Sequence, residues 1–447
     1  MKRKIGGFLL FLAQVVLFIS VPVMLFIGLR YYYPDSLYYF WGNIMVMLLY
    51  SAILYFMSRI YNGYNFGNSS LQEIILSWIL SLIIVNCIQY FVISLRAEAL
   101  LPILGLVYIS VAQIVIIIPV ASIVNMLYYR LNPAQKATIV YSSTEKLHAY
   151  GAIISKQWKK FRVDHVISQD EADNLLLDAV NKSGAVFFLD VDEKKLDRLI
   201  EYCYLHNIQT YIFPTFPKIL LNTARTVWLS DIPVFSVKSP HPDMGTLLIK
   251  RCMDIAISLI LIVLLSWLML GVWFAVYFYD KHPAIYRQVR VTRGRRRFTL
   301  YKFRSMRPDA EDDGVPRLTA KGDDRITPIG RFIRITRIDE LPQLFNVLSG
   351  SMSIVGPRPE RPEIAKQYEE IYPNFAFRTN VKAGITGFAQ IYGRYNTAPE
   401  DKLFLDIMYI ETHSIPEDIK LMLQTIKVIF KPSSTEGIGS DSTTALK

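Results

Sequence analysis

The sequence has few cysteines and no histidine cluster, which argues against a disulfide-stabilised fold and against a metal site built from these residues. Its three cysteines, Cys87, Cys203 and Cys252, are odd in number and lack paired spacing. They therefore predict neither a disulfide framework nor a zinc site. The six histidines never approach metal-ligand spacing. The first apolar run is long and lacks a small-residue cleavage site, so we expect no removable signal peptide.

Acidic residues are in the minority, and hydrophobic residues make up 52% of the 447 positions. This composition indicates membrane segments. The formal net charge is +11. In a membrane protein, an excess of basic residues is expected to meet anionic lipid or a phosphorylated substrate rather than nucleic acid. The length exceeds one ordinary core, so two or three domains are expected.

Four long runs with almost no charge fill the first 135 residues. They are Ile5–Gly28, Leu37–Met57, Leu71–Leu95 and Leu100–Tyr129. About twenty apolar residues suffice to span a bilayer, so each run predicts a transmembrane helix. The basic start, Lys2-Arg3-Lys4, places the N-terminus in the cytoplasm, and four spans return the chain there. Asn86 and Gln89 in the third span could line a site, although helix-to-helix hydrogen bonds are the favoured interpretation.

Residues 136–245 alternate short apolar strands with helical patterns. The expected strands are Thr138–Tyr141, Val163–Ile167, Val186–Leu189 and Gln209–Phe213. This alternation predicts a Rossmann-like α/β domain with a parallel, doubly wound sheet. The first strand runs into Ser142-Ser143-Thr144, without the glycines that let a dinucleotide approach the backbone. A regulatory or dimerising role is therefore favoured over nucleotide binding.

One acidic pair in this domain has the form of a metal site. Asp190 and Asp192 follow an apolar strand, as in metal-dependent glycosyltransferases that hold a nucleotide sugar. The same acids also fit a strand end and the start of the Glu193–His206 helix, whose dipole favours acidic residues. The interpretation as a strand end followed by a helix start is preferred, and a metal-dependent glycosyltransferase remains an alternative.

A further apolar run, Met253–Tyr279, is long enough to cross the membrane. Lys250-Arg251 precedes it and Arg295-Arg296-Arg297 follows it, so the positive-inside rule assigns both ends to the cytoplasm. A helix that breaks and returns within one leaflet satisfies this rule. No proline interrupts the run, so the break is expected at Ser266 or Gly271, with a straight span as the alternative.

The main candidate site is a pair of adjacent carboxylates, Asp339 and Glu340. The apolar residues that follow them have helical spacing, at Leu341, Leu344, Phe345 and Leu348. Pro342 fits a first helical turn, so the acids are predicted near a helix N-terminus, which also favours bound phosphate. The flanking arginines are Arg331, Arg334, Arg337 and Arg358. The pattern fits either a capped helix with surface ion pairs or chemistry on a phosphorylated substrate.

A basic face is expected on Phe298–Phe303, which pairs with Ile285–Val289 in a hairpin. Lys302 and Arg304 alternate with aromatic residues, so one face is basic and the other apolar. The basic face fits either anionic lipid or phosphate capture.

Six motifs follow one another between about Lys250 and Phe430. They are Lys250-Arg251 with Asp254, Tyr301-Lys302-Phe303-Arg304-Ser305-Met306, Thr327-Pro328-Ile329-Gly330-Arg331, Asp339-Glu340-Leu341-Pro342-Gln343, Gly356-Pro357-Arg358-Pro359 and Gly384-Ile385-Thr386-Gly387-Phe388-Ala389-Gln390. Together they resemble the bacterial sugar transferases that load a hexose-1-phosphate onto a polyprenyl phosphate. The chain departs from that pattern at Ala383 and in the apolar run, where proline is usual.

The resemblance implies that Asp339 attacks the sugar-linked phosphate, releases UMP and becomes a covalent phosphosugar intermediate. Glu340 is implied to hold Mg²⁺ or Mn²⁺ with Asp339, or to assist as a base. Metal and arginines would neutralise the charge of two anionic substrates. Arg334 and Arg358 match the family's phosphate-binding arginines. The other phosphate or nucleotide candidates are Lys302, Arg304, Gln390 and Arg394, with Asp406 and Tyr409 weaker.

The expected architecture has five parts. They are a four-helix transmembrane block (1–135), a Rossmann-like α/β domain (136–245), a re-entrant membrane helix (246–280), a mixed α/β membrane-associated catalytic domain (281–431) and a disordered tail (432–447). The expected function is transfer of hexose-1-phosphate from a UDP-hexose to undecaprenyl phosphate, the first membrane step of exopolysaccharide or capsule synthesis. The catalytic domain is expected on the cytoplasmic side of a bacterial inner membrane.

The expected partners are the UDP-hexose, undecaprenyl phosphate and the lipid bilayer, with a homodimer as a further arrangement and no nucleic acid. Two alternative functions remain open. One is a metal-dependent glycosyltransferase that uses Asp190 and Asp192, and the other is a non-catalytic membrane scaffold for polysaccharide assembly.

Overall fold

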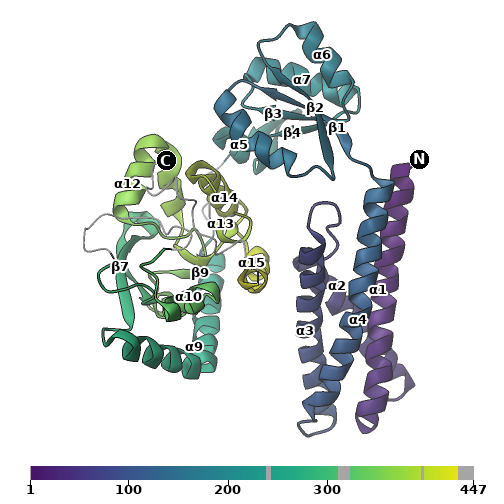
Figure 1. Cartoon of the computed structure of the whole chain (residues 1–447), viewed down its shortest axis with the longest axis vertical. Helices are drawn as coiled ribbons and strands as arrows, with labels where there is room; N and C mark the ends of the chain where they lie inside the picture. The colour runs from purple at the N-terminus through teal and green to yellow at the C-terminus, as the bar shows by residue number, and fades with distance from the viewer. Residues whose placement is uncertain (1, 238–242, 311–322, 394–396, 431–447) are drawn as a thin grey trace. The chain divides into compact units, whose positions relative to one another are not determined.

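The computed structural model describes residues 2–237, 243–310, 323–393 and 397–430. The chain divides into two compact units, Met1–Phe213 and Pro214–Lys447. The first contains long apolar helices and a parallel sheet, and the second contains a long apolar helix and a mixed α/β assembly (Figure 1).

Four long apolar helices open the first unit. They are α1 (Lys2–Tyr32), α2 (Phe40–Ile60), α3 (Leu71–Arg96) and α4 (Ile103–Leu131), with a short 3-10 turn, η1 (Pro34–Ser36), after α1. Each contains a stretch long and apolar enough to cross a membrane, as the sequence predicts. The helices share one apolar core that includes Leu25, Trp78 and Ile117.

A buried polar cluster links all four helices. The Tyr50 hydroxyl donates to Asn86 Oδ1 (2.7 Å), and Asn86 Nδ2 donates to Gln113 Oε1 (2.9 Å). Gln113 Nε2 then donates to the backbone oxygen of Val21 (3.0 Å). Because these residues lie on four different helices, their hydrogen bonds fix how the helices meet, which is the role favoured for Asn86. Gln89 Nε2, by contrast, has no such partner among the described residues.

A four-stranded parallel sheet forms the rest of the first unit. Its strands, in the order β2-β1-β3-β4, are β1 (Gln135–Tyr141), β2 (Phe161–Ser168), β3 (Ala185–Leu189) and β4 (Gln209–Ile212). The helices α5 (Thr144–Ser155), α6 (Asp173–Asn181) and α7 (Glu193–Leu205) alternate with the strands. Phe188 packs into a core with α6 and α7, and Phe187 packs into a second core with α5. All four strands predicted here are present, and the central strand β3 is buried throughout.

The second unit begins before residue 245, where the sequence pattern ends the middle domain. Its first elements are α8 (Phe216–Asn222), β5 (Arg225–Leu229) and β6 (Ile232–Ser236). Ile219 of α8 shares a core with Ile364 and Leu403, which lie far along the chain. A local sequence pattern does not record such distant contacts, so it cannot tell which core a helix joins.

One helix, α9 (Met244–Asp280), covers the segment predicted to break and return. It runs as a single α-helix over 37 residues, so the interruption expected at Ser266 or Gly271 does not occur in this described segment. Figure 1 nevertheless shows α9 bent into two arms. Ser266 Oγ donates to the backbone oxygen of Val263 (2.9 Å), a side-chain contact of the kind that bends a helix without breaking it.

The remainder of the second unit is a mixed α/β assembly. Its elements are β7 (Ile285–Val291), η2 (Arg293–Arg295), β8 (Arg297–Phe303), α10 (Pro328–Ile335), η3 (Ile338–Glu340), α11 (Gln343–Leu348), β9 (Ser353–Val355), α12 (Pro362–Ile371), η4 (Pro373–Asn380), β10 (Gly384–Thr386), α13 (Phe388–Ile391), α14 (Pro399–Thr412) and α15 (Ile415–Ile429). Strands β7 and β8 form the predicted antiparallel hairpin, whereas β9 and β10 pair in parallel. The predicted tail, 432–447, lies outside the described residues.

Candidate active site

The acid pair Asp339-Glu340 lies on η3, a single 3-10 turn between α10 and α11. The acids therefore precede the helix, and Pro342 takes its N-cap position instead of a place in the first turn. Arg337, just before the turn, has a left-handed backbone (φ 58°), which costs a non-glycine residue about 1–3 kcal/mol. Packing holds this tight turn in place, because Ile338 and Leu341 contact a buried apolar core.

Glu340 is the centre of a buried ion cluster. Its Oε1 accepts hydrogen bonds from Arg358 Nη2 (2.8 Å) and Lys302 Nζ (3.2 Å), and Arg337 Nη1 lies 3.6 Å away. Burial alone would raise the pKa of Glu340, but Arg358 and Lys302 outweigh burial and hold the pKa well below its usual value. Glu340 is therefore ionised at neutral pH.

Asp339 lies beside this cluster with one oxygen unengaged. Lys302 Nζ is 4.0 Å from Asp339 Oδ2, whereas the buried Oδ1 has no hydrogen-bond partner in the described part of the chain. Burial raises the pKa of Asp339, the charge of Lys302 opposes the rise, and the charge of Glu340 adds to it. A buried carboxylate oxygen without a partner is costly, so a native one calls for an explanation. An oxygen that must attack a substrate provides one, because its lone pairs have to be available.

Strand β8 positions Lys302 against the acids through a side-chain bridge to α11. Asn346 Oδ1 accepts from the Tyr301 backbone N–H (3.0 Å), and Asn346 Nδ2 donates to the Thr299 oxygen (2.8 Å). The same asparagine thus locks the strand that carries the lysine to the helix that follows the acids. Burial lowers the pKa of Lys302, and Glu340 counteracts this effect.

Arg358 reaches the cluster from the segment after β9, where two glycines allow a close backbone approach. A Cβ on Gly356 would lie 2.3 Å from the Lys382 oxygen, and one on Gly384 would lie 2.1 Å from the Gly356 nitrogen. Either substitution would force β9 and β10 apart. The motifs around Gly356 and Gly384 therefore meet in space.

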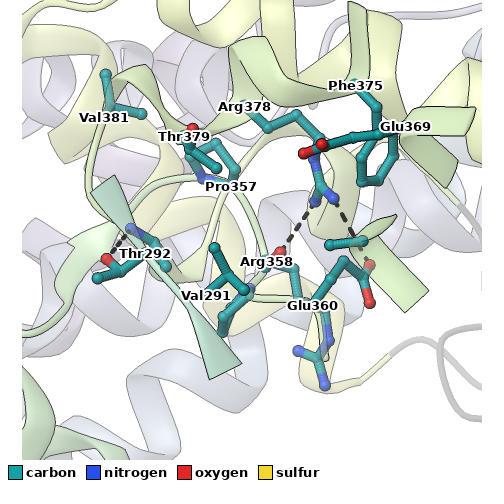
Figure 2. A pocket seen from close by; sticks show the side chains of 13 residues that line it. Val291, Thr292, Pro357, Arg358, Glu360, Glu369, Phe375, Arg378, Thr379 and Val381 are labelled. Carbon is teal, nitrogen blue, oxygen red and sulfur yellow. Dashed lines mark hydrogen bonds and ion pairs between the residues drawn. The ribbon is translucent and has the colours of Figure 1, made fainter. Parts of the chain in front are cut away.

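A small cavity lies beside this segment (Figure 2). Its lining includes Thr292, Glu360 and Arg378, and its volume is about 30 Å³. That is room for roughly two water molecules. The cavity is too small for a nucleotide sugar.

The structure brings three of the six predicted phosphate- or nucleotide-binding residues together. Lys302 and Arg358 contact Glu340, and the charge of Arg334 opposes the rise in the pKa of Asp339. Arg304 does not join them, because its Nη2 pairs with Asp280 Oδ1 (2.5 Å) at the end of α9.

The candidates late in the chain differ in their surroundings. Asp406 Oδ2 accepts from Arg378 Nε (2.6 Å), and the Tyr409 hydroxyl donates to Asp418 Oδ1 (2.8 Å), so both act within the protein interior. Both amide atoms of Gln390 are buried without a hydrogen-bond partner among the residues described, which leaves Gln390 able to take a ligand. Arg394 lies outside the described residues.

Two basic residues near the cluster were not among the predicted site residues. Arg290 Nη1 donates to the Pro359 oxygen (3.1 Å), and burial lowers the pKa of Arg290 to about 10. Arg378 Nη2 donates to the Arg358 oxygen (2.9 Å). Nothing in the sequence around either residue distinguishes it from other arginines of this basic region.

The acid pair in the first unit takes part in structural contacts. The Asp192 carboxylate and backbone N–H both contact the Gln169 amide, at 3.1 and 2.9 Å, and Asp190 lies 3.4 Å from Lys146. These contacts agree with the preferred interpretation of a strand end followed by a helix start.

The described residues include no group of three or more His, Cys, Asp or Glu side chains that could hold a metal ion. Mg²⁺ does not require such a group, because it binds through one or two carboxylates together with substrate phosphates and water. Asp339 and Glu340 offer that donor set, and the free Asp339 Oδ1 is one available ligand atom.

Comparison with known proteins adds a family match. Residues 245–432, which include the whole acid cluster, match the family model described as bacterial sugar transferase. A UDP-N-acetylgalactosamine-undecaprenyl-phosphate N-acetylgalactosaminephosphotransferase of Aeromonas hydrophila is 36% identical over 236 residues, which cover 52% of this chain and 55% of the relative.

Two other relatives are similar over different lengths. A UDP-glucose:undecaprenyl-phosphate glucose-1-phosphate transferase of Klebsiella pneumoniae is 38% identical over 208 residues (45% of this chain, 44% of the relative). An undecaprenyl-phosphate galactose phosphotransferase of Salmonella typhimurium is 30% identical over 330 residues (66% and 68%). The chain thus spans about half the length of the first two relatives and about two thirds of the third.

Proposed function

Since this chain belongs to the bacterial sugar transferase family, we propose that it transfers a hexose-1-phosphate from a UDP-hexose to undecaprenyl phosphate and releases UMP. The observation that carries the proposal is the buried Oδ1 of Asp339, which has no hydrogen-bond partner among the residues that the structure describes. It lies beside Glu340, which holds two cations. The names of the relatives, which include undecaprenyl phosphate, support the same acceptor. The reaction would be the first membrane step of exopolysaccharide or capsule synthesis.

The first step is attack by Asp339 Oδ1 on the phosphorus that bears the hexose. The bond from that phosphorus to the bridging oxygen breaks, its electron pair leaves with UMP, and the hexose phosphate stays on the carboxylate as an acyl phosphate. Arg358 and Lys302 stabilise the charge on the phosphoryl oxygens. In the second step, a phosphate oxygen of undecaprenyl phosphate attacks the same phosphorus, and the bond to Asp339 breaks.

Glu340 holds Arg358 and Lys302 in this scheme, and its lowered pKa makes it a poor proton acceptor. A base is unnecessary, because neither attacking oxygen has to lose a proton. Asp339 and Glu340 are the residues that would hold Mg²⁺ or Mn²⁺. When bound, the ion would neutralise charge on the diphosphate.

We also propose that both ends of α9 face the cytoplasm of a bacterial inner membrane, so that α9 enters the bilayer and returns. The basic flanks Lys250-Arg251 and Arg295-Arg296-Arg297 support this topology. The bend in Figure 1 supports it as well, because a bent helix can return without a broken backbone. The parallel sheet would serve as a Rossmann-like regulatory or dimerising domain, since the loop after β1 has no glycine.

The substitution Asp339→Asn tests the proposed nucleophile. It keeps the size of the side chain but removes its charge, so UMP release from UDP-hexose should fall by about 10³-fold or more. Asp190→Ala, in the first unit, is the control and should leave UMP release unchanged. In enzyme quenched during turnover without acceptor, mass spectrometry should locate a hexose phosphate on Asp339. An adduct at another residue, or loss of activity only in Asp190→Ala, would overturn the proposal.

A further inference from the structure

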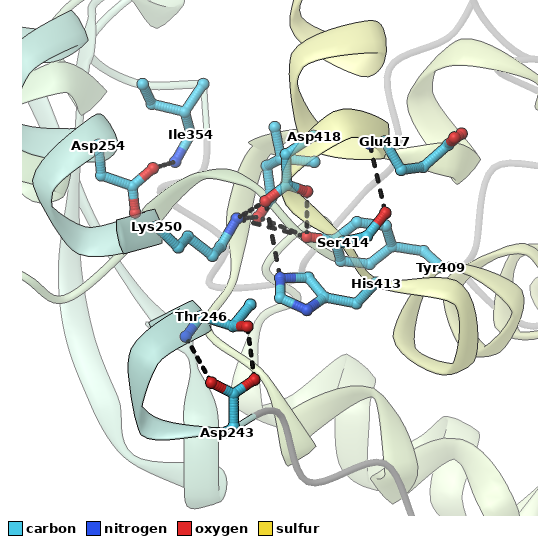
Figure 3. A network of polar contacts seen from close by, with 11 residues as sticks. Asp243, Thr246, Lys250, Asp254, Ile354, Tyr409, His413, Ser414, Glu417 and Asp418 are labelled. Carbon is cyan, nitrogen blue, oxygen red and sulfur yellow. Dashed lines mark hydrogen bonds and ion pairs between the residues drawn. The ribbon is translucent and has the colours of Figure 1, made fainter. Parts of the chain in front are cut away.

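The backbone oxygen of Val355 lies against two buried side chains outside the acid cluster. Lys250 Nζ on α9 donates a hydrogen bond to it (3.1 Å), and the hydroxyl oxygen of Tyr409 on α14 lies 3.2 Å from it. Val355 ends β9 three residues before Arg358, so these two side chains hold one end of the segment that carries the arginine. Figure 3 shows Lys250 and Tyr409 converging with Asp418.

Asp418 joins these two donors. It is fully buried, with Oδ2 2.5 Å from Lys250 Nζ and Oδ1 2.8 Å from the Tyr409 hydroxyl. His413 Nε2 lies 3.6 Å from the same carboxylate. Burial alone would raise the pKa of Asp418, but His413 and Lys250 hold it below its usual value. Without this carboxylate, Lys250 would be a buried cation without a counter-charge, which is strongly unfavourable.

A second contact holds the other end of the segment. The Arg358 backbone oxygen accepts from Arg378 Nη2 (2.9 Å), and Arg378 Nε donates to Asp406 Oδ2 (2.6 Å). Asp406 and Tyr409 are three residues apart on α14, so they share one face of that helix. One helix face thereby secures both ends of residues 355–358.

The segment between these two ends has little conformational freedom. Gly356 donates its N–H to the Thr386 oxygen (2.8 Å) on β10 and has no room for a Cβ. Pro357 has a fixed φ. The Arg358 guanidinium therefore depends for its position on where Val355 and the Arg358 backbone are held.

We propose that Asp418, acting through Lys250 and Tyr409, is a positioning residue: it fixes the backbone that holds the Arg358 guanidinium in contact with Glu340. This inference rests on the proposed function, in which Arg358 stabilises the phosphoryl group during transfer. Asp418 itself touches neither the acid pair nor, in this proposal, any substrate. A displacement of about 1 Å in a catalytic constellation can lower the rate about 10²-fold, so the effect should be visible in kcat.

Tyr409→Phe is the primary test variant, because it removes the hydroxyl that donates to Asp418 and lies against the Val355 oxygen, with little change in volume. Asp418→Asn is the second. In the full-length protein, each should lower kcat for UMP release about 10- to 100-fold and change KM for the UDP-hexose less than about threefold. Glu417→Gln is the matched control and should keep the native kcat. Glu417 lies next to Asp418 on α15, and its carboxylate pairs with Lys420 (2.9 Å).

A double-mutant cycle with Arg358→Ala separates positioning from a general structural role. If Asp418 and Tyr409 act through Arg358, then Tyr409→Phe should lower kcat less than about twofold in the Arg358→Ala background. Factors that multiply in the double variant would overturn the inference while leaving the proposed function intact. A native protein that releases no UMP from UDP-glucose, UDP-galactose or UDP-N-acetylgalactosamine would overturn both.

Discussion

At the scale of single residues, two adjacent buried carboxylates have pKa values shifted in opposite directions. Asp339 keeps one oxygen without a hydrogen-bond partner in the described part of the chain, and burial raises the pKa of Asp339. Glu340 is also buried, yet Arg358 and Lys302 lower its pKa. Paired groups whose environments separate their pKa values are typical of divided roles, which in the proposed reaction are those of a nucleophile and of a holder of cations.

This electrostatic arrangement predicts a pH dependence. Asp339 must be ionised to attack, so kcat/KM should fall as the pH drops through its pKa, which burial places above the ordinary aspartate value of about 3.9. Lys302→Met removes the charge that opposes this rise, so the acid limb should move to higher pH. Glu340→Gln removes the charge that adds to it, so the limb should move to lower pH.

Both variants should also lose about 10²-fold or more in kcat, because each removes a charge from the acid cluster. The measurement is the pH profile of UMP release for the native chain and the two variants. Shifts in the same direction would contradict the assignment of the acid limb to Asp339.

The acid pair could be predicted from the sequence because adjacent carboxylates near arginines form a local pattern. Lys302 and Arg358 were predicted through family motifs. Arg290 and Arg378 were not, because their roles come from contacts with the Pro359 and Arg358 carbonyls, far along the chain. Arg304 belongs to the same sequence motif as Lys302, but its side chain forms an ion pair with Asp280 instead of joining the acid cluster.

At the scale of elements, periodicity predicted the helix after the acids but not its surroundings. Leu344 is 4% exposed, whereas its neighbour Phe345 is 47% exposed although both belong to the predicted apolar face. In a membrane-associated protein an apolar side chain can face lipid as well as a core, and spacing alone does not distinguish the two. For α9, a break was expected at Ser266 or Gly271, whereas the structure has a continuous helix in which Ser266 Oγ donates to the Val263 oxygen.

The first turns of α9 anchor the catalytic elements, which gives a prediction for Arg251. Its Nη1 and Nη2 donate to the Val347 and Leu348 oxygens (2.6 and 2.7 Å) at the end of α11. Arg251→Met removes both of these hydrogen bonds, although the Val347 oxygen keeps the Gly350 N–H (3.0 Å). The variant should lower the free energy of unfolding by about 1–3 kcal/mol, measured by denaturation in detergent.

Arg251→Lys is the informative comparison for that prediction. A single ammonium cannot reproduce the planar fork that serves two carbonyls, so lysine should restore only part of the loss. Full restoration by lysine would show that charge alone, and not the fork, secures α11.

At the scale of the whole molecule, the features predicted from sequence are those with a local and periodic signal. The four helices before residue 135 and the four strands of the parallel sheet have such signals, and all are present. The assignment of α8 has no local signal, because Ile219 is buried by Ile364 and Leu403, more than a hundred residues later. Packing between distant segments therefore places α8 in the second unit, while the domain boundary at residue 245 stays a prediction.

Truncation and a core substitution test this boundary. A chain of residues 214–447 keeps Ile219 in its core, so it should melt at a higher temperature than one of residues 246–447. In the full-length chain, Ile219→Ala should cost about 2–5 kcal/mol of unfolding free energy. Leu221→Ala changes an exposed residue of the same helix and should cost less than about 0.5 kcal/mol. Equal melting temperatures for the two truncated chains, together with equal effects of the two alanines, would mean that α8 contributes nothing to the core of the second unit.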